Sequence, residues 1–158
     1  MGPTVHLLVI DNRDSFVYNV VELLRSLPEL TFEVIPEGEL ELSSLPEHDG
    51  LILSPGPGVP SEFPRMQALI RAEVGVKPIL GICLGHQALA EHYGATLVQL
   101  PAPRHGHASA LVVRDSADSL VGAIPTGSLV GRYHSWAVDE VSLPTCLLPT
   151  AYCAHADE

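Results

Sequence analysis

The pattern of apolar and polar residues divides the chain near Gly94. Before Gly94, four short apolar runs predict strands buried on both faces, at 5–10, 32–36, 50–54 and 77–82. Apolar residues recur at helical spacing in three segments of the same region, at 16–27, 65–74 and 84–94. After Gly94, four segments predict further strands with few helices between them, at 95–100, 109–115, 128–139 and 146–153.

The alternation of strands and helices predicts an α/β fold, with a parallel sheet and crossover helices on its faces. In such a sheet, ligands bind beyond the carboxyl ends of the strands. Three loops of unusual composition follow predicted strands, "DNRDS" (11–15), "SPGPG" (54–58) and "GICLGHQ" (81–87). We therefore expect these three loops to converge on one site.

Composition narrows the class of protein. The chain has 158 residues, 46% of them hydrophobic, which suffices for one domain with a substantial core. Its formal net charge of −11 argues against nucleic-acid binding and against an anionic membrane surface. No apolar run approaches the roughly 18 residues of a membrane span. Three cysteines without C-x-x-C spacing favour a reducing cytoplasm over a disulfide framework, and we expect no metal site.

Cys83 is the candidate nucleophile, because it lies between Gly81 and Gly85 in a G-x-C-x-G pattern that joins a strand to a helix. This pattern is the cysteine counterpart of the nucleophile elbow, a tight and strained turn that lifts the side chain out of the sheet edge. The start of the following helix favours a thiolate, and the Leu84 N–H there is free to face an oxyanion. A buried structural cysteine is the alternative interpretation, of equal weight on this motif alone.

The segment "SPGPG" (54–58) directly follows a predicted buried strand. Its two prolines fix the backbone, and its two glycines leave the backbone N–H groups accessible to a ligand. Such a loop suits a second oxyanion donor. Taken alone, it would be an ordinary Pro/Gly turn.

Five motifs in one order carry a family resemblance: "IDNRDSFVYN", "ILSPGPGVP", "PILGICLGHQALA", "HGHAS" and "GRYHSWAVD". Together they resemble the class I (triad-type) glutamine amidotransferases over essentially the whole chain. The resemblance is strongest to the components that serve anthranilate synthase and aminodeoxychorismate synthase. It implies a flavodoxin-like core, hydrolysis of L-glutamine without a cofactor, and delivery of ammonia to a separate chorismate-using synthase subunit, in tryptophan or in folate biosynthesis.

The resemblance also implies residue roles. Cys83 corresponds to the nucleophile that forms a glutamyl thioester, and the backbones of Gly58 and Leu84 correspond to the oxyanion hole. The residues that correspond to the glutamine site are Gly56, Pro57, Gly58, Gln87, Ser135 and Trp136.

Other polar residues have two interpretations each. Asp11, Asn12 and Asp14 could line the cleft, but a turn and helix cap are favoured. The segment 105–107 resembles a loop that faces the synthase, and a solvated loop is an equal alternative. For Arg132 and Tyr133, packing is favoured over ordering of the Ser135 strand.

The sequence offers no clear general base to activate Cys83. In the family it is a histidine in a His-x-Glu pattern near the end of the domain, and this chain has no such stretch. His155 is the nearest mimic, without the flanking strand and turn, and His86 points away from Cys83 on its helix. We therefore expect a single amidotransferase domain over 1–158, truncated before the catalytic His-x-Glu segment and impaired in catalysis.

Three function classes stay open on this reasoning. The first is a glutamine amidotransferase component, and the second is an inactive component that docks on the synthase. The third is an unrelated cysteine hydrolase on the same scaffold, against which Gln87 and "YHSW" argue.

Overall fold

The computed structural model describes residues 4–153. The chain divides into two compact units, Met1–Thr96 and Leu97–Glu158, which are described separately. The N-terminal unit is built on a four-stranded parallel sheet with the order β2-β1-β3-β4. Its strands are β1 (Val5–Asp11), β2 (Leu30–Pro36), β3 (Gly50–Leu53) and β4 (Ile79–Gly81).

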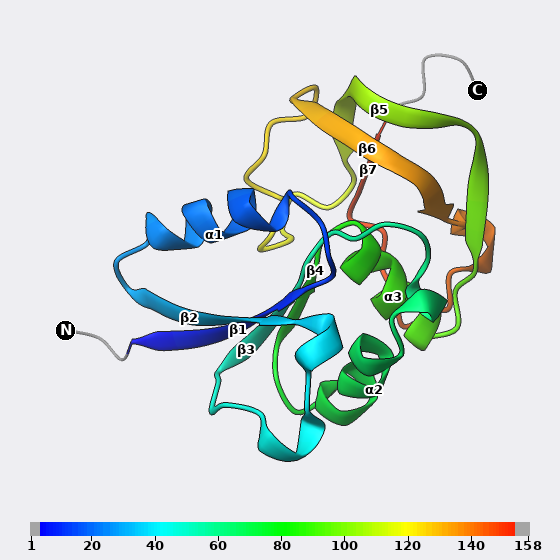
Figure 1. Cartoon of the computed structure of the whole chain (residues 1–158). Coiled ribbons are helices and arrows are strands. Elements are labelled where there is room, and N and C mark those ends of the chain that lie inside the picture. Colours follow the sequence, from blue (N-terminus) through cyan, green and yellow to red (C-terminus); the bar gives the residue numbers. More distant parts are fainter. Residues whose placement is uncertain (1–3, 154–158) are drawn as a thin grey trace. The chain divides into compact units, whose positions relative to one another are not determined.

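Helices cover both faces of this sheet (Figure 1). They are α1 (Val17–Arg25), α2 (Pro64–Glu73) and α3 (Leu84–His92). Gly94, the glycine predicted to end the third helix, follows α3 in the left-handed region with φ 99°. Three single-turn 3₁₀ helices lie in the connections, η1 (Glu37–Glu39), η2 (Leu42–Ser44) and η3 (Pro60–Glu62).

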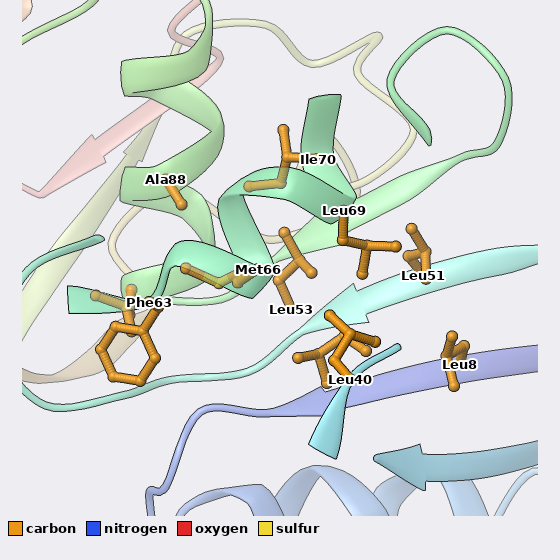
Figure 2. Close-up of a cluster of buried hydrophobic side chains, with 11 residues drawn as sticks. Leu8, Leu40, Leu51, Leu53, Phe63, Met66, Leu69, Ile70 and Ala88 are labelled. Carbon is orange, nitrogen blue, oxygen red and sulfur yellow. The ribbon is translucent and has the colours of Figure 1, made fainter. Parts of the chain in front are cut away.

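The strands alternate their side chains between two cores. Leu8, Leu51 and Leu53 face α2 and α3, where they meet Met66 and Leu69 (Figure 2). On the opposite face, Val9, Ile52 and Leu24 of α1 form a smaller cluster. Burial of each such side chain stabilises the fold by about 1.5–3 kcal/mol. Because both faces of β1 and β3 are covered, residues 7–10 of β1 and 51–53 of β3 are apolar without interruption, which is the pattern that predicted these strands.

The C-terminal unit contains a three-stranded antiparallel sheet with the order β6-β5-β7. Its strands are β5 (Leu97–Val113), β6 (Leu129–Val138) and β7 (Ala151–Cys153), and a 3₁₀ helix, η4 (Glu140–Ser142), follows β6. Two expectations were wrong here. The segments 95–100 and 109–115 belong to one long strand, and the segment 105–107 lies within that strand rather than in a loop.

The irregular part of β5 explains both errors. Its pairing with β6 shifts between Gln99 and Arg104 and again between His105 and His107, with Gly106 at φ 72°. The first shift accommodates two prolines, which have no N–H to donate to a neighbouring strand. A bulged strand therefore carries the same sequence signals as a loop.

The predicted fold class is confirmed, since the sheet of the N-terminal unit is parallel and its helices lie on both faces. Its strand order agrees with the first four strands of the flavodoxin-like order. The assignment of 1–158 to one domain stays a prediction. Within residues 4–153, no helix is long and apolar enough to cross a membrane.

Candidate active site

Three loops meet the carboxyl edge of the parallel sheet. The strand register aligns Ile10 with Leu53 and Leu53 with Gly81, so β1, β3 and β4 end side by side. The loops that follow are those at 11–15, 54–58 and 81–87. The register confirms the convergence that the topology predicted.

Cys83 occupies a strained turn between β4 and α3. Its backbone has φ 52° and ψ −105°, a region that residues other than glycine rarely adopt. A Cβ at Gly81 would lie 2.5 Å from the backbone of both Gly85 and His86, and a Cβ at Gly85 would lie 2.5 Å from the Cβ of Leu53. Both glycines therefore remove side chains that would collide with the adjacent helix and strand, as the G-x-C-x-G pattern predicts.

The electrostatics of Cys83 differ from the expectation. Burial raises the pKa of the thiol above its ordinary value, while a hydrogen bond from the Leu84 N–H lowers it and the Asp14 carboxylate raises it further. The net direction is upward. The predicted preference for a thiolate was therefore wrong for these surroundings, because desolvation outweighs the hydrogen bond from the Leu84 N–H.

Two backbone N–H groups fit an oxyanion hole. The Leu84 N–H opens α3 and is held at the Cys83 sulfur. The Gly58 N–H finds no hydrogen-bond partner within residues 4–153, and Gly58 adopts φ 68°. The loop at 54–58 packs on α3, because a Cβ at Gly56 would overlap the Leu84 side chain. Both groups are suited to stabilise charge on a carbonyl oxygen, and their assignment stays a prediction.

The acidic loop at 11–15 is mainly structural. Asp11 accepts a hydrogen bond from the Arg13 N–H, and Asp14 accepts one from the Phe16 N–H at the start of α1. These contacts agree with the favoured turn and cap. Asn12 differs, because it is fully buried and bonds Ser54 across the sheet edge. Its hydrophilic side chain gave no signal of this burial in the sequence.

The remaining predicted site residues divide between the two units. Gln87 is buried one turn into α3, where its N–H donates to the Cys83 carbonyl oxygen. Ser135 and Trp136 are half-buried in β6 of the C-terminal unit. Nearby on β6, Arg132 is buried and its Nε donates to His134, 3.2 Å away. That contact favours an ordering role for Arg132 in addition to packing.

No described histidine of the N-terminal unit hydrogen-bonds Cys83. His6 contacts Thr31, and His48 contacts the Pro46 carbonyl oxygen, both away from the carboxyl edge. His86 is exposed on α3. His155 lies outside the described residues.

Comparison with known proteins decides the family. The model of the family "Glutamine amidotransferase class-I" matches residues 8–158. The chain belongs to this family. The resemblance drawn from the five motifs is thereby confirmed, and the unrelated cysteine hydrolase is excluded.

Relatives of this amidotransferase include components of two different synthases. Anthranilate synthase component 2 of Lactococcus lactis is 42% identical over 141 residues, which cover 87% of this chain and 69% of that protein. Aminodeoxychorismate synthase component 2 of Serratia marcescens is 40% identical over 152 residues, which cover 92% and 76% respectively. In structure, a proposed GMP synthase subunit from Thermoplasma acidophilum matches with a TM-score of 0.82 at 26% identity, covering 98% of this chain and 75% of that one.

Proposed function

We propose that this amidotransferase is the glutamine-hydrolysing component of anthranilate synthase, with Cys83 as its nucleophile. The observation that carries the proposal is the strained Cys83 turn at φ 52°, placed at the start of α3 beside a backbone N–H. The similarity to anthranilate synthase component 2 supports the choice of synthase.

The proposed reaction has two halves. The Cys83 thiolate attacks the amide carbon of glutamine, and the N–H groups of Gly58 and Leu84 stabilise the oxyanion that forms. The oxyanion collapses, the C–N bond breaks, and the nitrogen leaves as ammonia after gaining a proton. Water then attacks the carbonyl carbon of the glutamyl thioester, and the C–S bond breaks. Glutamate leaves with the water oxygen in its side-chain carboxylate, and Cys83 regains its proton.

The glutamine itself is bound by the remaining predicted residues. Gly56 and Pro57 would line the substrate beside Gln87, and the backbone of Ser135 and Trp136 would hold its α-amino and carboxylate groups. Ammonia is used by a partner synthase subunit that binds chorismate. We further propose that the component acts in the cytoplasm.

A second candidate is the corresponding component of aminodeoxychorismate synthase. The 40% identity to the Serratia marcescens protein favours it almost equally. Both candidates use the same glutamine chemistry and differ in the synthase they serve. Reconstitution with each synthase, with glutamine as the only nitrogen donor, separates them by product.

A further part of the proposal concerns the group that accepts the proton of the Cys83 thiol. Within the described N-terminal unit no histidine hydrogen-bonds the thiol, and the pKa of the thiol is raised. General acid–base help is typically worth about 10²- to 10⁴-fold in rate. We propose that the 158 residues alone bind glutamine and hydrolyse it at least about 10²-fold more slowly than a version extended through a His-x-Glu segment.

Glutamate release, measured with the synthase present, tests both proposals. The Cys83→Ala variant of the extended version should lose activity, and retained activity would exclude Cys83 as the nucleophile. If the 158-residue chain matches the extended version and His155→Ala abolishes its activity, then His155 is the base. An extended version that binds the synthase without releasing glutamate would indicate an inactive docking component.

A further inference from the structure

Asn12 is a completely buried polar side chain at the carboxyl edge of the sheet, and it is bonded to the loop at 54–58. Its backbone N–H donates to Ser54 Oγ at 2.9 Å, and its side-chain Nδ2 donates to the Ser54 carbonyl oxygen, also at 2.9 Å. Ser54 Oγ in turn donates to the Pro55 carbonyl oxygen at 2.7 Å. Three hydrogen bonds therefore fix the first two residues of the loop.

Asn12 also determines where the loop lies against α3. A Cβ at Gly56 would be 2.9 Å from the Cβ of Asn12 and would overlap the side chain of Leu84. Gly56 thus occupies a narrow space with Asn12 on one side and Leu84 on the other. Because Leu84 and Gly58 carry the two candidate oxyanion donors, the packing of Asn12 bears directly on their separation.

The far end of the loop has an anchor of its own. Glu62 accepts a hydrogen bond from the Val59 N–H at 2.9 Å, and its carboxylate lies against Gly58. Between the two anchors, Pro55 and Pro57 have no N–H, and the N–H of Gly58 is left for a ligand. Asn12 and Glu62 together hold a loop that makes few hydrogen bonds of its own.

The bonding of Asn12 is incomplete in a way that argues against a purely structural role. Its Oδ1 atom is buried and has no hydrogen-bond partner among the described residues. A buried acceptor without a donor lowers stability, so the side chain occupies this position at a cost to the fold. That cost is accounted for if the amide donor is required at Ser54.

From this geometry we propose that Asn12 is a positioning residue, which holds the Gly58 N–H at the distance from the Leu84 N–H that the oxyanion requires. The inference rests on the proposed glutamine hydrolysis. Asn12 touches neither glutamine nor Cys83 in this role. It acts only through the loop at 54–58.

The test compares Asn12→Ala and Asn12→Asp with the exposed Asn19→Ala on α1 as the matched control. Asn12→Asp keeps the shape of the side chain and removes the donor to Ser54. Full-length gene product with its synthase is assayed for kcat and KM of glutamine hydrolysis. The alkylation rate of Cys83 by iodoacetamide is measured in parallel, because alkylation forms no oxyanion.

We expect kcat to fall by about 10- to 100-fold in both Asn12 variants, approaching the loss seen when an oxyanion donor is removed. KM and the alkylation rate should stay within about threefold, and Asn19→Ala should match the wild type. Ser54→Ala, which removes only the hydroxyl contacts, should lower kcat by a smaller factor. It serves as the test if the Asn12 variants do not fold.

Several outcomes would overturn the proposal. Folded Asn12 variants with the kcat of the wild type would show that the loop holds its place without the amide. A parallel fall of kcat and alkylation would mean that Cys83, and not the loop, has moved. An inactive wild type would contradict the proposed function instead.

Discussion

At Gly85, α3 lies close to the inner strand β3, and Gly85→Ala tests whether that approach builds the elbow. The added Cβ would lie 2.5 Å from the Cβ of Leu53 and 2.8 Å from its carbonyl carbon, and it would overlap the carbonyl oxygen. Ordinary contact begins at 3.4 Å, so α3 must withdraw by about 1 Å. No side-chain rotation relieves the overlap, because most of the atoms in contact belong to the backbone of a buried strand.

The energy of this change follows from two opposing effects. Overpacking of a filled core costs about 1–3 kcal/mol, and alanine in a helix gains at most about 1 kcal/mol over glycine. A net loss of about 1–2 kcal/mol corresponds to a melting temperature lower by about 2–8 °C for a chain of this size. The displacement also moves Cys83, and a misplacement of about 1 Å can lower kcat by about 10²-fold.

Thermal unfolding followed by circular dichroism, with glutaminase activity below the transition, measures both effects. Gly38→Ala is the matched control, since a Cβ there meets nothing within 4 Å and the residue is not in the left-handed region. This control should be neutral or slightly stabilised, by up to about 1 kcal/mol. If Gly85→Ala melts and reacts like Gly38→Ala, the close approach of α3 to β3 does not explain the glycine.

Three further predictions follow from single contacts. Gly58→Ala should lower kcat by about 10²- to 10³-fold without changing Cys83 alkylation, because the added Cβ at φ 68° overlaps Glu62 and displaces the proposed oxyanion donor. An unchanged kcat in the steady-state assay would contradict this prediction. Burial raises the pKa of Cys83, so alkylation of the thiol should begin at higher pH in the folded protein than in urea. For the same reason, the stability of the folded protein should fall as the pH rises through the raised pKa. Glu73→Gln should stabilise the fold by about 1 kcal/mol in urea titrations, because the new amide can donate to His48 Nε2. That atom lies 3.8 Å from Glu73 Oε2, and neither atom has a hydrogen-bond partner among the described residues. A destabilised variant would contradict this prediction.

Most of the N-terminal unit could be predicted because its signals are local. Each strand there is short and buried on both faces, and each helix repeats its apolar residues within one segment. The close approaches at Gly81 and Gly85 were also visible, since glycines on both sides of a candidate nucleophile indicate a turn packed too tightly for side chains. The predicted ends of these elements differ from those observed by at most two residues, as for α1, expected over 16–27 and found at Val17–Arg25.

The features that escaped prediction depend on contacts between distant segments. The bulges of β5 appear only when its register with β6 is known. The burial of Asn12 requires the carboxyl end of β3 beside that of β1, 42 residues away in the chain. The pKa of Cys83 was misjudged for the same reason, since the helix start is visible in the sequence and the surrounding protein is not.

The raised pKa of Cys83 limits how the site can work. The strained turn sets the sulfur at the start of α3, and burial and the Asp14 carboxylate raise the pKa of the thiol above its ordinary value. A well-placed thiol that stays protonated is protected from alkylation and oxidation, since the thiolate is the reactive form. Reactivity must then arise when a proton acceptor reaches the sulfur, and no described histidine of the N-terminal unit hydrogen-bonds it. Under the proposed mechanism, the N-terminal unit would supply the nucleophile and the oxyanion hole, and the base would decide when the nucleophile becomes active.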